Sequence, residues 1–198
     1  ALEMLGAEAQ VYLPNRFTDG YGPNESVYKY FIEQQNVSLI ITVDNGVAGH
    51  EAIAYAQSQG VDVIVTDHHG LPVELPEAFA IVHPEHPKAD YPFKYLAGCG
   101  VAFKVACALL ESIPTEMLDL VAIGTIADMV SLTDENRIMV KVGLEILKQT
   151  ERIGLIELMK VSDVDMADVN EETVGFKIAP QLNALGRLDD PNPAVELL

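Results

Sequence analysis

Two short runs of largely apolar, β-branched residues, at 37–43 and 61–66, constrain the fold of this sequence more than any other feature. Neither run shows the alternation of a half-exposed strand, so both are expected to be strands of a parallel sheet whose faces are covered. Helical segments at 24–35 and 49–59 alternate with them, and a third strand is expected at 80–82. This order of elements predicts an α/β fold with a parallel sheet flanked by helices.

The rest of the chain is expected to contain one more short strand, at 10–13, and a helical part that begins at Gly98. Apolar periodicity and capping residues place helices at residues 100–112, 114–128, 136–149, 153–159 and 172–185. The α/β pattern gives way to helices near residues 132–135. We therefore predict a Rossmann-like α/β domain at residues 1–135 and a C-terminal helical extension at residues 136–198.

The charge of the chain bears on which partners it can bind. Lys and Arg together number 12 against 30 Asp and Glu, which gives a formal net charge of −18. A surface that binds phosphates is normally basic, so this balance by itself argues against a nucleic-acid partner. Carboxylates that hold divalent ions reverse the local charge, however, and an acidic chain of that kind can bind phosphates. Composition alone leaves both interpretations open.

The cysteines and the hydropathy of the sequence indicate the cellular compartment in which the chain is expected to work. Cys99 and Cys107 lie eight residues apart on an expected helix, where reduced, packed side chains are the simplest interpretation. The sequence has no signal-like opening and no apolar run long enough to span a bilayer. We therefore expect a cytoplasmic protein with no membrane partner.

Candidate site residues follow the first two strands of the predicted sheet. Asp44 comes directly after one run, and Asp67, His68 and His69 come directly after the next, 23 residues further along. Parallel sheets bind ligands at the carboxyl ends of their strands, where these side chains should lie. Asp44 alone could simply shape a turn, but two adjacent histidines after a buried strand are unusual. Carboxylate and imidazole together suit manganese or a similar divalent ion.

Three other polar residues have less distinctive surroundings. Asp128 ends a largely apolar helix, where a buried aspartate would need a partner, and a metal, a helix cap or an arginine would each provide one. Periodicity alone leaves these alternatives open. His83 and His86 are flanked by prolines and are interpreted as loop residues.

At the level of motifs, residues 43–46, 66–69 and 124–128 resemble, in order, the second, third and fourth motifs of the DHH phosphoesterase superfamily. Further stretches resemble segments of the RecJ branch of that superfamily: residues 96–103, residues 179–188, and residues 14–17 with 20–22. The resemblance covers essentially the whole chain, and the combination of motifs is highly specific.

The resemblance implies roles for the candidate residues at the strand ends and beyond. Asp44, His68 and Asp128 would be metal ligands, with Asp44 as the bridge between two ions. His69, in the catalytic centre, would face the substrate phosphate or support the site. Asp67 would orient the two histidines rather than bind metal.

The resemblance also implies a phosphate-binding set and two departures from the family pattern. Arg16, Asn183 and Arg187 match positions at the substrate, where a planar guanidinium suits phosphate oxygens. Gln181 stands where the branch usually has arginine. The first motif, an Asp-x-Asp pair, is expected just upstream of Ala1, and without it the second metal site would be incomplete and this chain impaired or inactive.

The function that the resemblance implies is divalent-metal-dependent 5′→3′ exonuclease action on single-stranded DNA in repair and recombination. The cofactor would be Mn²⁺ or Mg²⁺, with two ions in the full-length enzyme. Residues 1–135 would form the catalytic domain, and the helical extension would lead toward further domains of the same chain. Partners would be single-stranded DNA and repair proteins that the sequence does not identify. The alternatives are a DHH phosphoesterase for short oligonucleotides or cyclic-dinucleotide products, and a catalytically inactive scaffold.

Overall fold

The computed structural model describes residues 1–15, 17–20, 22–188 and 190–198, and the chain divides into two compact units. One unit, Arg16–Ala102, carries the sheet, and the other combines Ala1–Asn15 with Phe103–Leu198 and is helical. None of the helices in the described part of the chain has the length and apolar character needed to cross a membrane.

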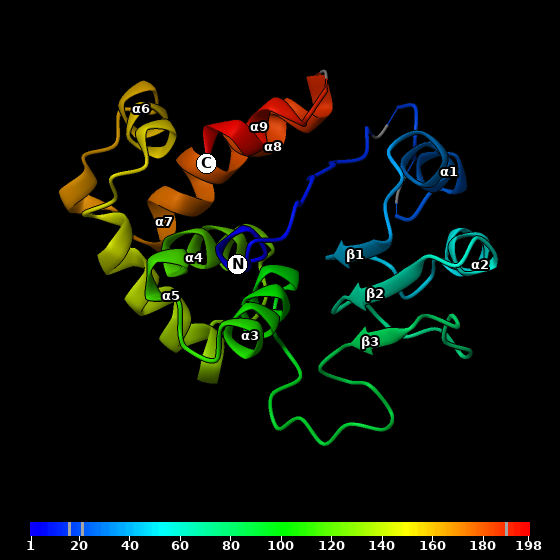
Figure 1. Ribbon diagram of the computed structural model, residues 1–198. Coiled ribbons are helices and arrows are strands. Elements are labelled where there is room, and N and C mark those ends of the chain that lie inside the picture. The colour runs from blue at the N-terminus through cyan, green and yellow to red at the C-terminus, as the bar shows by residue number, and fades with distance from the viewer. Residues whose placement is uncertain (16, 21, 189) are drawn as a thin grey trace. The chain divides into compact units, whose positions relative to one another are not determined.

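The sheet has the predicted parallel arrangement. Its strands follow one another in sequence order and point the same way (Figure 1): β1 (Leu39–Val43), β2 (Asp62–Thr66) and β3 (Ala80–Val82). Val43 pairs with Thr66, and Thr66 pairs with Val82, so the three strands end level with one another. The residues that follow the strands therefore emerge along one edge of the sheet.

Two helices complete the sheet-bearing unit. They are α1 (Glu25–Gln34) and α2 (His50–Ser58), which pack against each other, and α2 also packs against β2 (Figure 1). The Asn24 side chain caps α1 by accepting hydrogen bonds from the backbone of Ser26 and Val27. These features confirm the predicted alternation of strands and helices.

The two long strands differ in burial. Val63 and Val65 of β2 are fully buried, as predicted for a strand of a covered sheet. Leu39 and Val43 of β1 are 44% and 47% exposed, so the expectation that this run is covered on both faces was wrong. The reason is that β1 is an outer strand of the sheet in the described residues, whereas β2 lies between two neighbours.

Residues 10–13 form no strand, contrary to the prediction. The N–H of Leu13 donates to the side-chain oxygen of Asn192 at 2.7 Å, and the Asn192 amide donates back to the Leu13 carbonyl at 3.2 Å. One side-chain amide thus satisfies both backbone groups that a neighbouring strand would otherwise bind. Val11 is 64% exposed, so the apolar pattern here does not report burial.

The helical unit contains the predicted helices, most with ends shifted by no more than about two residues. Its elements, together with the helix that leads into it, are η1 (Glu3–Leu5), α3 (Gly98–Leu110), η2 (Thr115–Met117), α4 (Leu118–Ala127), α5 (Asp134–Leu147), α6 (Ile153–Val161), η3 (Met166–Asp168), α7 (Glu171–Thr173), η4 (Val174–Ile178), α8 (Ala179–Leu188) and α9 (Pro193–Leu197). Its core lies around the packing of α4 against α5, with Ile123, Val140 and Leu144 buried.

The helix expected at 172–185 differs from the prediction in its middle. A π-helical turn, η4, separates α7 from α8 and ends directly before Ala179-Pro180. Proline lacks the N–H of an α-helical hydrogen bond, and its ring clashes with the carbonyl four residues earlier, here that of Phe176. The wider turn lets the helical path continue through Pro180.

Gly143 allows α5 to approach α4 closely, and replacing it should be costly. A Cβ at Gly143 would overlap the Leu118 carbonyl oxygen and lie 2.6 Å from the Ala122 Cβ. Gly143→Ala should lower the free energy of unfolding by about 1–3 kcal/mol, measured by urea denaturation. Gly175→Ala is the control, because its Cβ would meet Ile126 at an ordinary 3.5 Å. Equal losses in both variants would contradict the account.

Candidate metal centre

The site is built where neighbouring parallel strands end. Beyond the last residue of β1, the Asp44 N–H donates to the Thr66 carbonyl at 3.0 Å. Beyond the last residue of β2, the Asp67 N–H donates to the Val82 carbonyl at 3.2 Å. The ladder therefore continues one residue past each strand and sets both aspartates at the carboxyl edge, where parallel sheets bind ligands.

Asp44 occupies a sharp turn that directs its carboxylate away from the core. Its φ is 64°, in the left-handed region that aspartate tolerates better than most residues. The Thr42 hydroxyl braces the turn by donating to the Asn45 carbonyl at 2.6 Å. Gly46 follows at φ 124°, and a Cβ there would lie 2.6 Å from the Thr42 hydroxyl. The turn leaves the Asp44 side chain 53% exposed and available to a ligand.

Asp67 is the most heavily bonded carboxylate of this edge and is almost completely buried. One oxygen, Oδ2, accepts from the Val47 N–H at 3.1 Å. The other, Oδ1, accepts from the N–H groups of His68 at 2.7 Å and His69 at 3.1 Å, and from Nδ1 of the His69 ring at 2.8 Å. The carboxylate thus organises both the turn before α2 and the two histidines that follow β2.

These contacts also control the charge of Asp67. Burial acts to raise the pKa of the carboxyl, but hydrogen bonds from Val47, His69 and His68 favour the ionised form. Their combined effect holds the pKa of Asp67 below its usual value. Because the ionised carboxylate can only accept, Nδ1 of His69 carries the proton of that bond, and the Nε2 lone pair is left for another partner.

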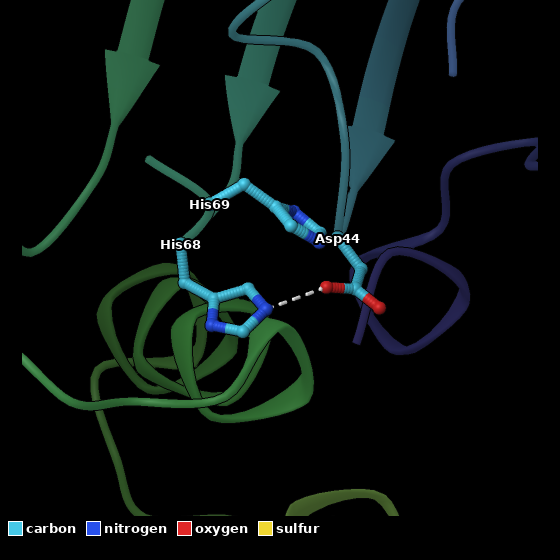
Figure 2. A group of neighbouring side chains, drawn as sticks. All are labelled: Asp44, His68 and His69. Atoms are coloured by element: carbon cyan, nitrogen blue, oxygen red, sulfur yellow. Dashed lines mark ion pairs between the residues drawn. The ribbon is translucent and has the colours of Figure 1, made fainter. Parts of the chain in front are cut away.

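Asp44, His68 and His69 form a compact group of metal-ligand types (Figure 2). One ligand atom from each residue lies within 4.8 Å of the others, and Nε2 of His68 lies 3.0 Å from Oδ1 of Asp44. The His68 side chain is 12% exposed and that of His69 is 59% exposed. A carboxylate and two imidazoles at this spacing fit a divalent ion such as Mn²⁺.

Gly98, the first residue of α3, leaves room for the Asp44 side chain. A Cβ at this buried position would overlap Oδ1 of Asp44 and would lie 2.6 Å from its Cγ. The glycine-rich segment recognised in the sequence therefore contributes a space that only glycine leaves open. Any larger residue would push the Asp44 carboxylate out of its present place.

His83 is a residue whose contact with the site the sequence analysis missed. It does lie in a loop, as predicted, but it is 4% exposed, and its ring Nε2 lies 2.8 Å from the His69 carbonyl oxygen. A signal was present in the sequence, because His83 directly follows the third strand just as Asp44 and Asp67 follow the first two.

The other predicted site residues belong to the helical unit or lie outside the described residues. Asp128 is the exposed C-cap residue of α4, and Asn183 is exposed on α8. Gln181 donates from its side-chain amide to the Ser162 hydroxyl at 2.7 Å. Arg16 and the side chain of Arg187 lie outside the part of the chain that the structure describes.

With the fold and this edge of the sheet defined, comparisons with known proteins establish the class. Residues 1–125 match the model of the DHH family, N-terminal domain. This match spans more than half of the chain, and the chain belongs to the DHH family.

The relatives confirm the predicted resemblance to the RecJ branch. The chain is 54% identical over 197 residues to the single-stranded-DNA-specific exonuclease RecJ of Bacillus subtilis, covering 100% of this chain and 25% of that protein. It is 36% identical over 201 residues to RecJ of Thermus thermophilus, covering 100% of this chain and 29% of that protein. The chain thus spans between 25% and 29% of the length of these two relatives.

Solved structures agree with the fold. A crystal structure of exonuclease RecJ bound to manganese superposes with a TM-score of 0.87 at 35% identity, covering 100% of this chain and 50% of that one. The structure of RecJ with Mn²⁺ from Thermus thermophilus superposes with a TM-score of 0.81 at 32% identity, covering 100% of this chain and 28% of that one. The predicted α/β fold is confirmed.

Replacing Asp67 by asparagine should destabilise the sheet edge. Asp67→Asn keeps the size of the side chain. In the wild type both carboxylate oxygens accept hydrogen bonds from N–H groups, whereas in the variant one of them is replaced by an NH2 group and the other is a weaker, neutral acceptor. We expect the free energy of unfolding in metal-free buffer to fall by about 2–3 kcal/mol, measured by urea denaturation. Asp62→Asn, at the exposed start of the same strand, should change it little. Equal effects would contradict the role assigned to Asp67.

Proposed function

We propose that this chain forms the metal-binding part of a 5′→3′ exonuclease that hydrolyses single-stranded DNA. The observation that carries the proposal is the cluster of Asp44, His68 and His69 at the carboxyl ends of β1 and β2. Membership of the DHH family and the names of the RecJ relatives support the same reaction. The activity belongs to the whole protein, of whose relatives this chain spans a fraction.

The cofactor in this proposal is Mn²⁺ or Mg²⁺, in keeping with RecJ structures that were solved with each ion. Asp44, His68 and Asp128 would hold it, and Asp44 would bridge to a second ion. Divalent ions supply a hydroxide nucleophile at neutral pH and neutralise charge on the phosphate.

The side chains would position the substrate. Asp67 holds the His69 ring through Nδ1, which leaves Nε2 to face a phosphate oxygen of the strand. Arg16, Asn183 and Arg187 would bind the terminal phosphate or its neighbours. In this arrangement no side chain needs to act as a nucleophile, and ligation and positioning are what the protein contributes.

The charge of the chain shapes the expected DNA binding. At a net charge of −18, few phosphate contacts can come from its 12 basic residues, and Lys29, Lys94, Lys104, Lys148 and Lys160 each already pair with a glutamate. We infer that this chain alone binds single-stranded DNA weakly and that further domains of the protein hold most of the strand. Repair proteins remain partners of unspecified identity.

Metal binding tests the cluster directly. Mn²⁺ titrated into the chain in a calorimeter should bind with low micromolar affinity, and Asp44→Ala and His68→Ala should each abolish binding because each removes a ligand. His86→Ala is the matched control, since this histidine lies outside the cluster, and it should bind as the wild type does. Binding that is indifferent to both ligand substitutions would exclude this cluster as the metal site.

Gly98→Ala tests the space beside Asp44 without removing a ligand. The added methyl group should displace the Asp44 carboxylate and weaken Mn²⁺ binding by about 10-fold or more, a loss typical of disturbed metal surroundings. Gly70→Ala serves as the control, because a Cβ there would meet nothing within 4 Å. Unchanged Mn²⁺ affinity in Gly98→Ala would contradict the proposed fit.

Polarity and substrate length test the activity. With Mn²⁺, the whole protein, of which this chain is the metal-binding part, should release mononucleotides from the 5′ end of a labelled single strand and should leave a blunt duplex largely intact. The same preparation carrying Asp44→Ala should release none. Release from the 3′ end, or faster hydrolysis of dinucleotides than of long strands, would contradict the proposal.

A further inference from the structure

We propose that His83 is a positioning residue, which holds the His68-His69 segment in its metal-binding conformation through a hydrogen bond to the His69 carbonyl. The proposal deepens the proposed function and rests on it for the link to metal. The hydrogen bond between His83 and the His69 carbonyl requires no metal ion. His83 is the residue directly after β3, so the third strand of the sheet also contributes a residue to the site.

The protonation of the His83 ring follows from its two partners. Nδ1 lies 3.0 Å from the backbone nitrogen of Glu85, which can only donate, so Nδ1 accepts. Nε2 lies 2.8 Å from the carbonyl oxygen of His69, which can only accept, so Nε2 donates. Both bonds are satisfied by one neutral tautomer. His83 is buried, so few water molecules can compete for these bonds.

This bond completes the fixation of the His69 peptide unit and ring. The His69 N–H and its ring Nδ1 both donate to Oδ1 of Asp67, at 3.1 and 2.8 Å. The carbonyl on the other side of the residue is bound by His83. Asp67 and His83 thus hold the residue from both sides, and the direction in which the His69 Nε2 points is set by both.

His86 offers an internal comparison within the same loop. Like His83, it is followed by proline, and its Nδ1 accepts from the backbone N–H two residues later, that of Lys88, at 3.1 Å. In the part of the chain that the structure describes, no hydrogen bond joins its ring to the cluster, and it is less buried than His83. The turn bond is therefore common to both histidines, and the bond to His69 is what distinguishes His83.

Disturbing such a contact should weaken metal binding without removing a ligand. Groups that orient metal ligands through hydrogen bonds typically change metal affinity by about 10–100-fold when they are replaced. His83→Leu removes both ring bonds at similar side-chain volume. His83→Gln restores a donor near the place of Nε2, while it lacks the ring acceptor for Glu85.

The first measurement is amide hydrogen exchange by NMR on the metal-free chain. In His83→Leu the amides of His68 and His69 should exchange about 10-fold faster or more, because the segment they belong to is released on one side. The buried Ile53 amide, in α2, should keep its rate and so report unchanged global stability. His83→Gln should return the two amides to near the wild-type rate, and His86→Leu should leave them unaffected.

Three results would overturn the proposal: unchanged rates at His68 and His69 in His83→Leu, an equal acceleration at Ile53, or the same effect from His86→Leu. The second measurement is Mn²⁺ calorimetry on the same variants, where Kd should rise about 10-fold in His83→Leu and recover in His83→Gln. If the wild-type chain binds no Mn²⁺, the proposed function fails, while the exchange rates still decide the role of His83.

Discussion

The metal centre depends on the hydrogen bonds of the buried Asp67 carboxylate. An ionised group at 1% exposure is costly unless its oxygens are bonded, and here Val47, His68 and His69 supply the donors. Through these hydrogen bonds the carboxylate connects the loop before α2 to the segment after β2 and sets the His69 tautomer. The same bonds that make burial of Asp67 tolerable therefore arrange the side chains that face a ligand.

Around this carboxylate, each strand contributes one polar residue at its carboxyl end. Asp44 follows β1, Asp67 follows β2 and His83 follows β3, and parallel pairing brings the strand ends level. Local backbone geometry then orients the Asp44 side chain: the left-handed φ of Asp44 turns it outward, and Gly98 leaves space for its carboxylate. Binding capacity here is a property of the sheet edge, and α2 packs against the central strand β2.

Much of this arrangement could be predicted from sequence. Two apolar runs, each ending in aspartate, were enough to predict a parallel sheet and to bring Asp44 near His68 and His69, because strand order and direction follow from the spacing. The partial exposure of β1 and the conformation of residues 10–13 could not be predicted this way. The first depends on the outer position of the strand in the sheet, and the second depends on a hydrogen-bond partner far along the chain. Leu13 finds the side chain of Asn192, almost the full chain length away. His83 was missed because its flanking prolines led to a loop interpretation, although it directly follows the third strand.

We expect the carboxyl edge of β1 and β2 to be a divalent-metal site. Crystals grown with Mn²⁺ and measured at a wavelength where manganese scatters anomalously would test it most directly. We predict an anomalous peak within coordination distance of the Asp44 carboxylate and the His68 imidazole. A peak bound by other residues alone, or no peak at this edge at saturating Mn²⁺, would contradict it.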